Sequence, residues 1–278
     1  MSATPASDPD DANDLRGLHF HKLIRKWTTW ACIAGGALLC AVIGLVVWGA
    51  IVGAVFLVVA VPVGVFVTWR VADSQAAGDF FRVYAGRRGM ELGGKTSLPT
   101  STPLLRRGNR RYASRTLTGR LAPGVDGRLA LYTSVDESAD GRGNPKVELH
   151  LFTLGMTEVP ESARYVPELY CESKFGLGGL DGGSRHSMEQ VELESAALDE
   201  KYEVFCRKDQ DANWLRQLFS PTFIVWLTDS APSGFAFELV DGTLVAYVQY
   251  YKEDTADLDG IAAATGAVAT RLREESTE

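Results

Sequence analysis

No charged side chain occurs between Lys26 and Arg70. The uncharged run is roughly 43 residues long, about twice what one helical crossing of a bilayer requires. Because every backbone amide in hydrocarbon must be hydrogen-bonded internally, such a run predicts transmembrane helices. A single helix would be roughly 65 Å long against a hydrocarbon core of about 30 Å. We therefore expect two antiparallel spans, at about 27–47 and 51–69, within a membrane segment of residues 21–70.

The charges on both sides of this run predict its orientation. Basic side chains precede the first span and follow the second: His21, Lys22, Arg25 and Lys26 before, and Arg70, Arg82, Arg87 and Arg88 after. Since cytoplasmic flanks carry an excess of Lys and Arg, both termini are predicted to be cytoplasmic in a multi-pass plasma-membrane protein. Residues 1–20 are predicted to form a disordered acidic tail. A secretory signal peptide is disfavoured by the length of the run.

Charge is divided unevenly along the rest of the chain. The stretch 70–115 carries about +7 and the stretch 116–278 about −14, within an overall net charge of −7. Residues 71–111 are predicted to be a basic juxtamembrane linker, in which four arginines are grouped: Arg106, Arg107, Arg110 and Arg111. They favour either contact with anionic lipid or a simple positive-inside bias. The acidic domain that follows argues against a nucleic-acid partner.

Residues 112–278 are long enough for one globular domain with its own core. Alternating apolar residues predict half-buried antiparallel strands over 129–135 and 147–152, joined by a polar loop over 136–145. Asp241-Gly242 predicts a tight hairpin turn. Helices are expected from Asp211 or a neighbouring residue, from Ser220-Pro221, and over residues 255–273. In the last of these the apolar stripe comprises Leu258, Ile261, Thr265, Val268 and Leu272. The predicted fold class is α+β: a transmembrane hairpin, then a mainly antiparallel β domain with a C-terminal helix packed on the sheet.

The sharpest motif match is the segment from Gly89 to Thr96. Gly89, Gly94, Lys95 and Thr96 have the spacing of a P-loop, which binds nucleotide phosphates. That chemistry requires a buried strand before the loop and a helix after it. The preceding residues are basic, and Pro99 would interrupt a following helix. The match is thus a weak indication of cofactor binding, and chance spacing is the preferred interpretation.

Other site chemistries receive little support from the sequence. Asp136 to Gly141 imitates the start of a calcium loop, but Val147 stands where the loop requires glutamate. Cys32 and Cys40 lie in the first span, and Cys171 and Cys206 lack the paired spacing of a zinc site. A cysteine nucleophile served by His150 is conceivable, although buried thiols are the commoner case. We predict no catalytic residue, no cofactor and no metal ligand.

Several segments carry a resemblance to a known group of proteins. They are Val191 to Ser195, Lys201 to Val204, Leu218 to Phe223, and Thr102 to Gly108 in the linker. Through them the chain resembles a family of uncharacterised bacterial (actinobacterial) membrane proteins. The resemblance implies two N-terminal spans, a basic connector and a cytoplasmic α+β domain, and it implies no activity or site residue.

Two classes of function remain open from the sequence. The preferred one is a membrane protein that presents a cytoplasmic binding or adaptor domain, with the bilayer and a protein of unknown identity as partners. The alternative is a membrane-anchored enzyme or nucleotide-binding protein that uses Lys95 and Thr96. Non-enzymatic binding is favoured, because no segment reaches the specificity of a catalytic signature.

Overall fold

The computed structural model describes residues 77–139, 145–176, 188–208 and 210–277. Contacts divide the chain into two compact units, Met1–Tyr84 and Ala85–Glu278. The predicted tail and both predicted membrane spans lie outside the described residues. Among the helices that are described, none has the length and hydropathy of a membrane span.

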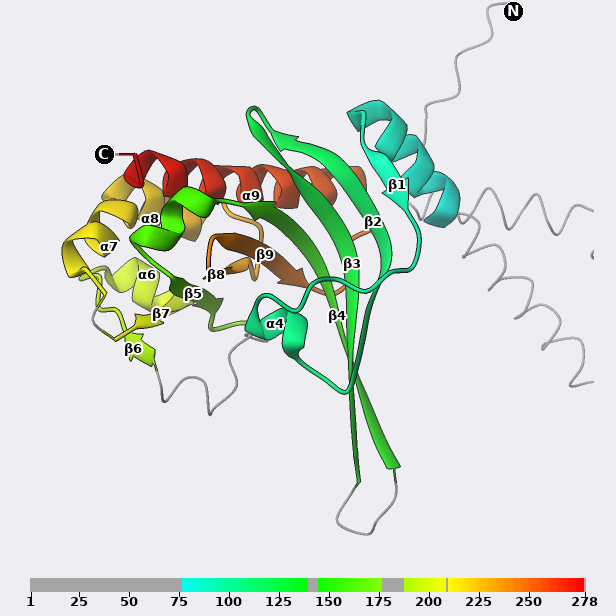
Figure 1. Cartoon of the computed structure of the whole chain (residues 1–278), viewed down its shortest axis with the longest axis horizontal. Helices are drawn as coiled ribbons and strands as arrows, with labels where there is room; N and C mark the ends of the chain where they lie inside the picture. The colour runs from blue at the N-terminus through cyan, green and yellow to red at the C-terminus, as the bar shows by residue number, and fades with distance from the viewer. Residues whose placement is uncertain (1–76, 140–144, 177–187, 209, 278) are drawn as a thin grey trace, which may run out of the picture. The chain divides into compact units, whose positions relative to one another are not determined.

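The second unit is built on one antiparallel sheet of nine strands, in the order β1-β2-β3-β4-β9-β8-β5-β7-β6 (Figure 1). The large antiparallel sheet and the C-terminal helix confirm the predicted α+β class. Consecutive strands β1 to β4 are neighbours, whereas the hairpin β8-β9 lies between β4 and β5. The strands are β1 Glu91–Gly93, β2 Arg110–Ala122, β3 Val125–Ala139, β4 Pro145–Glu158, β5 Glu168–Ser173, β6 Met188–Gln190, β7 Tyr202–Arg207, β8 Ala236–Val240 and β9 Thr243–Gln249.

The predicted hairpin at Asp241-Gly242 is confirmed. These two residues join β8 to β9 with φ angles of 47° and 80°. Both angles lie in the left-handed region, as the two central residues of a type I′ turn require. Because this turn matches the twist of the strands, it fixes the register that places Val240 opposite Thr243.

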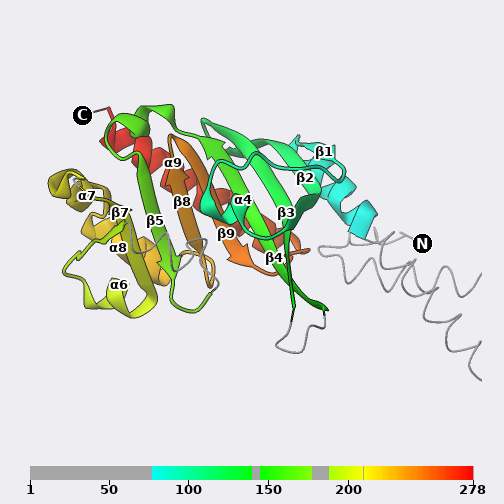
Figure 2. The same ribbon diagram turned by 60° about the horizontal axis from the view of Figure 1, so that its bottom comes forward.

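The C-terminal helix α9, Thr255–Glu275, covers one face of the sheet (Figure 2). The predicted stripe is confirmed, because all five of its residues are buried. Asp254 caps the N-terminus by accepting a hydrogen bond from the Asp257 N–H at 2.7 Å. Helix and sheet approach closely at Gly155 of β4, where a Cβ atom would lie only 2.0 Å from Thr265 Oγ1.

The opposite face is covered by a short segment around α4, Pro103–Arg106. Leu104 and Leu105 are almost completely buried there, in a cluster that includes Tyr132, Phe152 and Tyr247. β8 and residues 129–135 of β3 are consequently buried on both faces, although the sequence predicts the strand over 129–135 to be half-buried. The prediction was wrong because a segment assigned to the linker supplies the second layer of the core.

Three further helices gather at the β7 side of the sheet (Figure 1): α6 Ala196–Lys201, α7 Ala212–Leu218 and α8 Pro221–Asp229. The sequence predicts a helix start at Asp211 or a neighbouring residue, and Asp211 is the N-cap, where its carboxylate accepts the N–H of Asn213 at 2.8 Å. Ser220 occupies the N-cap position before Pro221, as expected, but its side chain makes no capping hydrogen bond. A 3₁₀ helix, Pro160–Arg164, joins β4 to β5.

The compact sheet unit begins at Ala85, well before residue 112. A helix over 77–88 leads into it, and β1 then pairs with β2 from Glu91 to Gly93. Most of the residues that we expected to be linker therefore belong to the folded sheet unit.

Candidate binding surface

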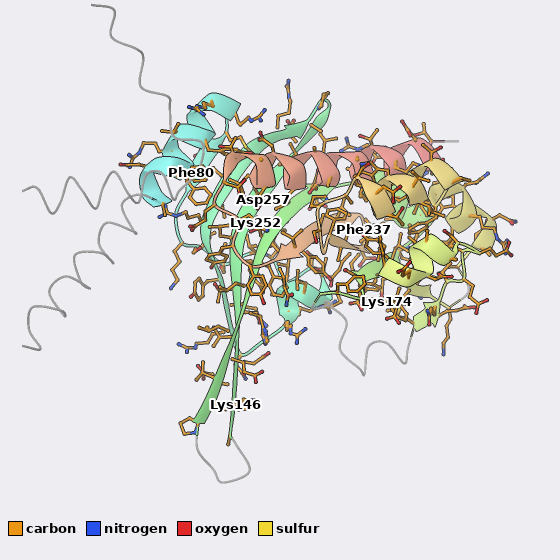
Figure 3. All side chains as sticks on the ribbon, turned by 180° about the vertical axis from the view of Figure 1, so that it is seen from behind. Phe80, Lys146, Lys174, Phe237, Lys252 and Asp257 are labelled. Atoms are coloured by element: carbon orange, nitrogen blue, oxygen red, sulfur yellow. The ribbon has the colours of Figure 1, made fainter. Side chains whose placement is uncertain are left out.

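The far ends of β3 and β4 project from the sheet as a two-stranded ribbon, residues 136–139 and 145–151 (Figure 1). We call this element the ribbon. It occupies part of the predicted polar loop 136–145, because β3 continues to Ala139 and β4 begins at Pro145. Lys146 lies near its far end (Figure 3).

One edge of the ribbon is open. β9 pairs with β4 only from Phe152 onward, so no described strand covers β4 between Pro145 and Leu151. The Tyr250 N–H donates to the Leu151 carbonyl oxygen at 2.7 Å, which shows that the backbone of Leu151 faces the β9 side. Because residues alternate between the two neighbours in an antiparallel ladder, Val147 and Leu149 also direct their N–H and C=O groups to this open edge.

The ribbon also exposes apolar side chains. Val147 is 55% exposed and Leu149 is 62% exposed. The half-buried strand predicted over 147–152 would place both residues on its buried face, and this prediction was wrong for them. Their alternation continues the pattern of the sheet, but neither α9 nor any other described element reaches far enough to cover them. Single exposed apolar residues are common on protein surfaces, whereas two neighbours on one face of a free strand form a small patch suited to contact.

Charged side chains pair with one another on both faces of the ribbon: Asp136 stands opposite Glu148 on the face away from the apolar patch, whereas Glu137 stands opposite Val147 on the same face as the patch. Asp136 lies 3.1 Å from His150 Nε2 and 4.0 Å from Arg107 Nε. Arg110 Nη2 lies 2.5 Å from Glu137 Oε1. Asp136 and Glu137, which begin the calcium-like sequence, thus form ion pairs at the base of the ribbon.

The four grouped arginines lie around this base but have different surroundings. Arg107 and Arg110 pair with carboxylates, as described above. Arg111 donates to the carbonyl oxygens of Arg106 and Gly108, at 2.5 and 3.3 Å. Within the described part of the chain, Arg106 and Arg111 have no carboxylate within ion-pair distance, and both are exposed. These two therefore keep more of their charge available to a ligand than Arg107 and Arg110.

Beneath α4 the sheet buries a carboxyl group that the sequence analysis missed. Glu238 of β8 is fully buried, and its Oε2 accepts the Leu104 N–H at 3.1 Å. Burial raises the pKa of Glu238 to about 7; the nearby Thr102 hydroxyl and the Leu104 N–H oppose the rise, and Glu172 adds to it. Thr102 Oγ1 and Glu238 Oε1 nevertheless make no hydrogen bond of ordinary geometry in the described residues.

Further hydrogen bonds fix α4 to the sheet. Tyr132 Oη donates to the carbonyl oxygen of Leu105 at 3.2 Å, and burial raises the pKa of Tyr132 to about 12. Ser134 Oγ donates to the carbonyl oxygen of Arg107 at 2.9 Å. Gly108 follows with φ of 83°, and a Cβ atom there would lie 2.4 Å from Ser134 Oγ. Since only glycine fits this turn without strain, the path from α4 into β2 is tightly determined.

The P-loop-like residues lie elsewhere, along the β1 edge. Gly89 ends the helix over 77–88, and Gly94 follows the edge strand β1. The Lys95 ammonium stands 4.1 Å from the ring centre of Tyr112, and Thr96 forms a bridge with Ala113. In this part of the chain, neither a buried strand precedes the glycines nor a helix begins at Lys95. The backbone thus lacks the strand-loop-helix arrangement that holds a phosphate.

Reactive and metal-binding groups do not converge on a site in the described residues. Cys171 and Cys206 are free thiols, and burial raises the pKa of both, that of Cys206 to about 11. Such thiols are poor nucleophiles near neutral pH. The described ranges contain no group of three His, Cys, Asp or Glu residues that could hold a metal ion.

A groove of about 540 Å³ lies at the other end of β2 and β3, away from the ribbon. Its lining includes Pro99, Met156, Arg128 and Arg273. Arg273 donates to the carbonyl oxygens of Gly124 and Glu158, at 2.9 and 3.1 Å. These bonds hold the end of α9 against the sheet, so Arg273 serves the fold.

Comparisons with known proteins provide one structural likeness. No protein-family model matches the chain, and no curated protein matches it significantly in sequence. Among solved structures, it is similar to the crystal structure of the mycobacterial trehalose monomycolate transport factor A, TtfA, with 10% sequence identity and a TM-score of 0.43. The alignment covers 72% of this chain and 93% of the other.

Proposed function

We propose that the chain is a membrane-anchored binding protein that presents its sheet unit in the cytoplasm and contacts a protein partner through the ribbon. The uncharged run of the sequence supports the anchor, and its basic flanks support the orientation. The observation that carries the binding role is the exposure of Val147 and Leu149 beside an open strand edge. An edge of this kind offers backbone hydrogen bonds together with apolar contacts.

The internal pairing of charges supports a protein partner rather than a simple electrostatic one. Asp136 and Glu137 partly neutralise Arg107 and Arg110, and Lys146 pairs with Glu148 at 2.5 Å. The ribbon therefore presents a small apolar patch among side chains whose charges are nearly balanced. Surfaces of that character rely on shape and apolar contact more than on long-range attraction.

A photo-crosslinking residue at position 149 of the full-length protein, in native membranes, tests this proposal. We expect irradiation to join the crosslinking residue at position 149 to a discrete protein, and the substitution Val147→Asp to remove that product. A probe at Val225 of α8 is the matched control, because Val225 is 57% exposed and lies outside the ribbon. Equal labelling from both positions, or none from either, would refute the binding role.

A second proposal concerns anionic lipid, and the exposure of Arg106 and Arg111 favours it. Each basic residue near an anionic membrane surface contributes about 1 kcal/mol of attraction, which salt screens. We expect the pair Arg106→Gln and Arg111→Gln to weaken the flotation of the sheet unit, residues 85–278, with anionic vesicles at low salt. Flotation that is unchanged by both substitutions and by salt would contradict the proposal.

A further inference from the structure

We infer, on the basis of the proposed binding role of the ribbon, that the protein partner is a second copy of this chain. The two copies pair their ribbons along the open β4 edges, antiparallel and about a twofold axis at Val147. Three features of the ribbon support a second copy as the partner: the length of the free β4 edge, the direction of its N–H and C=O groups, and the pattern of its charged side chains.

The backbone limits the available registers. A twofold axis at Leu149 would place Val147 opposite Leu151 of the second copy, but the Leu151 carbonyl oxygen already accepts the Tyr250 N–H. The free edge therefore extends only from Pro145 to about His150. An axis at Val147 or at Glu148 centres the pairing on this stretch, and either one lets the outward N–H and C=O groups of Val147 meet a partner strand.

The side chains then select between these two axes. An axis at Glu148 would place the two Glu148 carboxylates directly opposite one another, which is destabilising. An axis at Val147 places Lys146 of each copy opposite Glu148 of the other, which gives two ion pairs. Lys146 and Glu148 are exposed and already lie on one face, 2.5 Å apart within each chain. The charge pattern thus favours one register and opposes its neighbour.

The apolar patch completes the pairing. On the face opposite Lys146 and Glu148, the two Val147 side chains meet across the axis, and each Leu149 lies beside Pro145 of the other copy. Pro145 has no N–H to donate, so it ends the paired stretch. A symmetric contact of this kind is isologous and closed, so it produces a dimer rather than an open filament of subunits.

Disulfide trapping tests the twofold axis directly. In a hydrogen-bonded antiparallel pair the opposed Cα atoms are about 5.5 Å apart, within the range that a disulfide spans. We expect Val147→Cys in the full-length protein, with Cys32 and Cys40 replaced by alanine, to form a crosslinked dimer under mild oxidation. Val225→Cys is the matched control and should remain monomeric. Absence of a Val147→Cys dimer would overturn the inference.

Charge reversal tests the register. Lys146→Glu or Glu148→Lys alone replaces two attractive cross-pairs by two repulsive ones, and we expect about a tenfold loss of Val147→Cys crosslinking in each case. Two differently tagged chains, one with each substitution, should crosslink with one another at the original level, because every opposed pair is then complementary. Crosslinking that is insensitive to these charges would overturn the register.

The photo-crosslinking experiment at position 149 separates the failure of the dimer from failure of the proposed function. A product of twice the chain mass supports both statements. A product with a different protein, together with no Val147→Cys dimer, overturns the second copy and retains the binding role. No product in either experiment overturns both.

Discussion

The buried carboxyl group of Glu238 predicts an unusual dependence of stability on pH. Glu238→Gln preserves the shape of the protonated side chain: its amide oxygen can still accept the Leu104 N–H, and its NH₂ group can donate to the unpartnered Thr102 Oγ1. The substitution removes only the charge that wild-type Glu238 acquires as the pH rises. Since Glu238 lies in the apolar layer beneath α4, that charge is costly.

The magnitude follows from the pKa. Folding raises the pKa of Glu238 from 4.5 to about 7, and each unit corresponds to about 1.4 kcal/mol. A carboxyl with a raised pKa stabilises the fold fully below the unfolded pKa and loses that contribution as the pH rises through the folded value. Wild type should therefore lose about 3 kcal/mol relative to Glu238→Gln between pH ~4 and pH ~8.

Urea unfolding of the full-length protein in non-ionic detergent, followed by near-ultraviolet circular dichroism, measures this difference. We expect the two proteins to have similar free energies of unfolding near pH ~4, and the variant to be the more stable one near pH ~8. Glu192→Gln is the matched control, because Glu192 is exposed and should show no such divergence. A wild-type protein that gains stability relative to Glu238→Gln as the pH rises would refute the assigned burial of the charge.

Three further predictions concern single residues between Lys95 and Gly108. Leu105→Ala should lower the free energy of unfolding by about 2–5 kcal/mol in urea titrations, because Leu105 is only 1% exposed in the α4 layer. Gly108→Ala should cost about 1–3 kcal/mol in the same assay, since its φ is 83° and its Cβ would meet Ser134; a neutral effect would contradict the described turn. Lys95→Ala should lose only the contact with the Tyr112 ring, about 0.5–1 kcal/mol, and ATP with Mg²⁺ should shift the melting temperature of neither protein.

The elements that could be predicted from sequence are those whose signals are local. The α9 stripe from Leu258 to Leu272 has a helical period, and Asp241-Gly242 determines its own turn chemistry. Capping at Asp211 likewise depends on residues within one helical turn. Each of these features is specified by a few neighbouring residues, so each could be read without knowledge of the tertiary structure.

Burial on the second face of the sheet could not be predicted in this way. Leu104 and Leu105 stand among arginines and prolines, so their composition indicates a linker, and only the fold places them over Tyr132. Glu238 is missed for the same reason, because an alternating strand places it on the face that would otherwise be solvated. For Val147 and Leu149 the error has the opposite sign, because residues predicted to be buried are exposed. The alternation of apolar residues does not reveal where the covering helix ends.

The candidate surface could be predicted only in part. The sequence identifies the arginine group, but not the carboxylates of Asp136 and Glu137 that pair with two of its members. Those contacts join residues about 27 positions apart through the β2-β3 register, which depends on a β-bulge between Ala113 and Arg115. Pairings of this kind require the tertiary structure, because no local pattern encodes the register shift.

The position of the hairpin β8-β9 has a consequence for the order of synthesis. β4 and β5 are made before the strands that separate them in the sheet, which are β8 and β9 within residues 236–249. Until those residues leave the ribosome, β4 lacks its neighbour β9 and β5 lacks its neighbour β8. The open edges of both strands are then exposed to other chains. The sheet therefore closes only after residues 236–249 have been made, so we expect truncations that remove the hairpin to aggregate rather than to fold as smaller units.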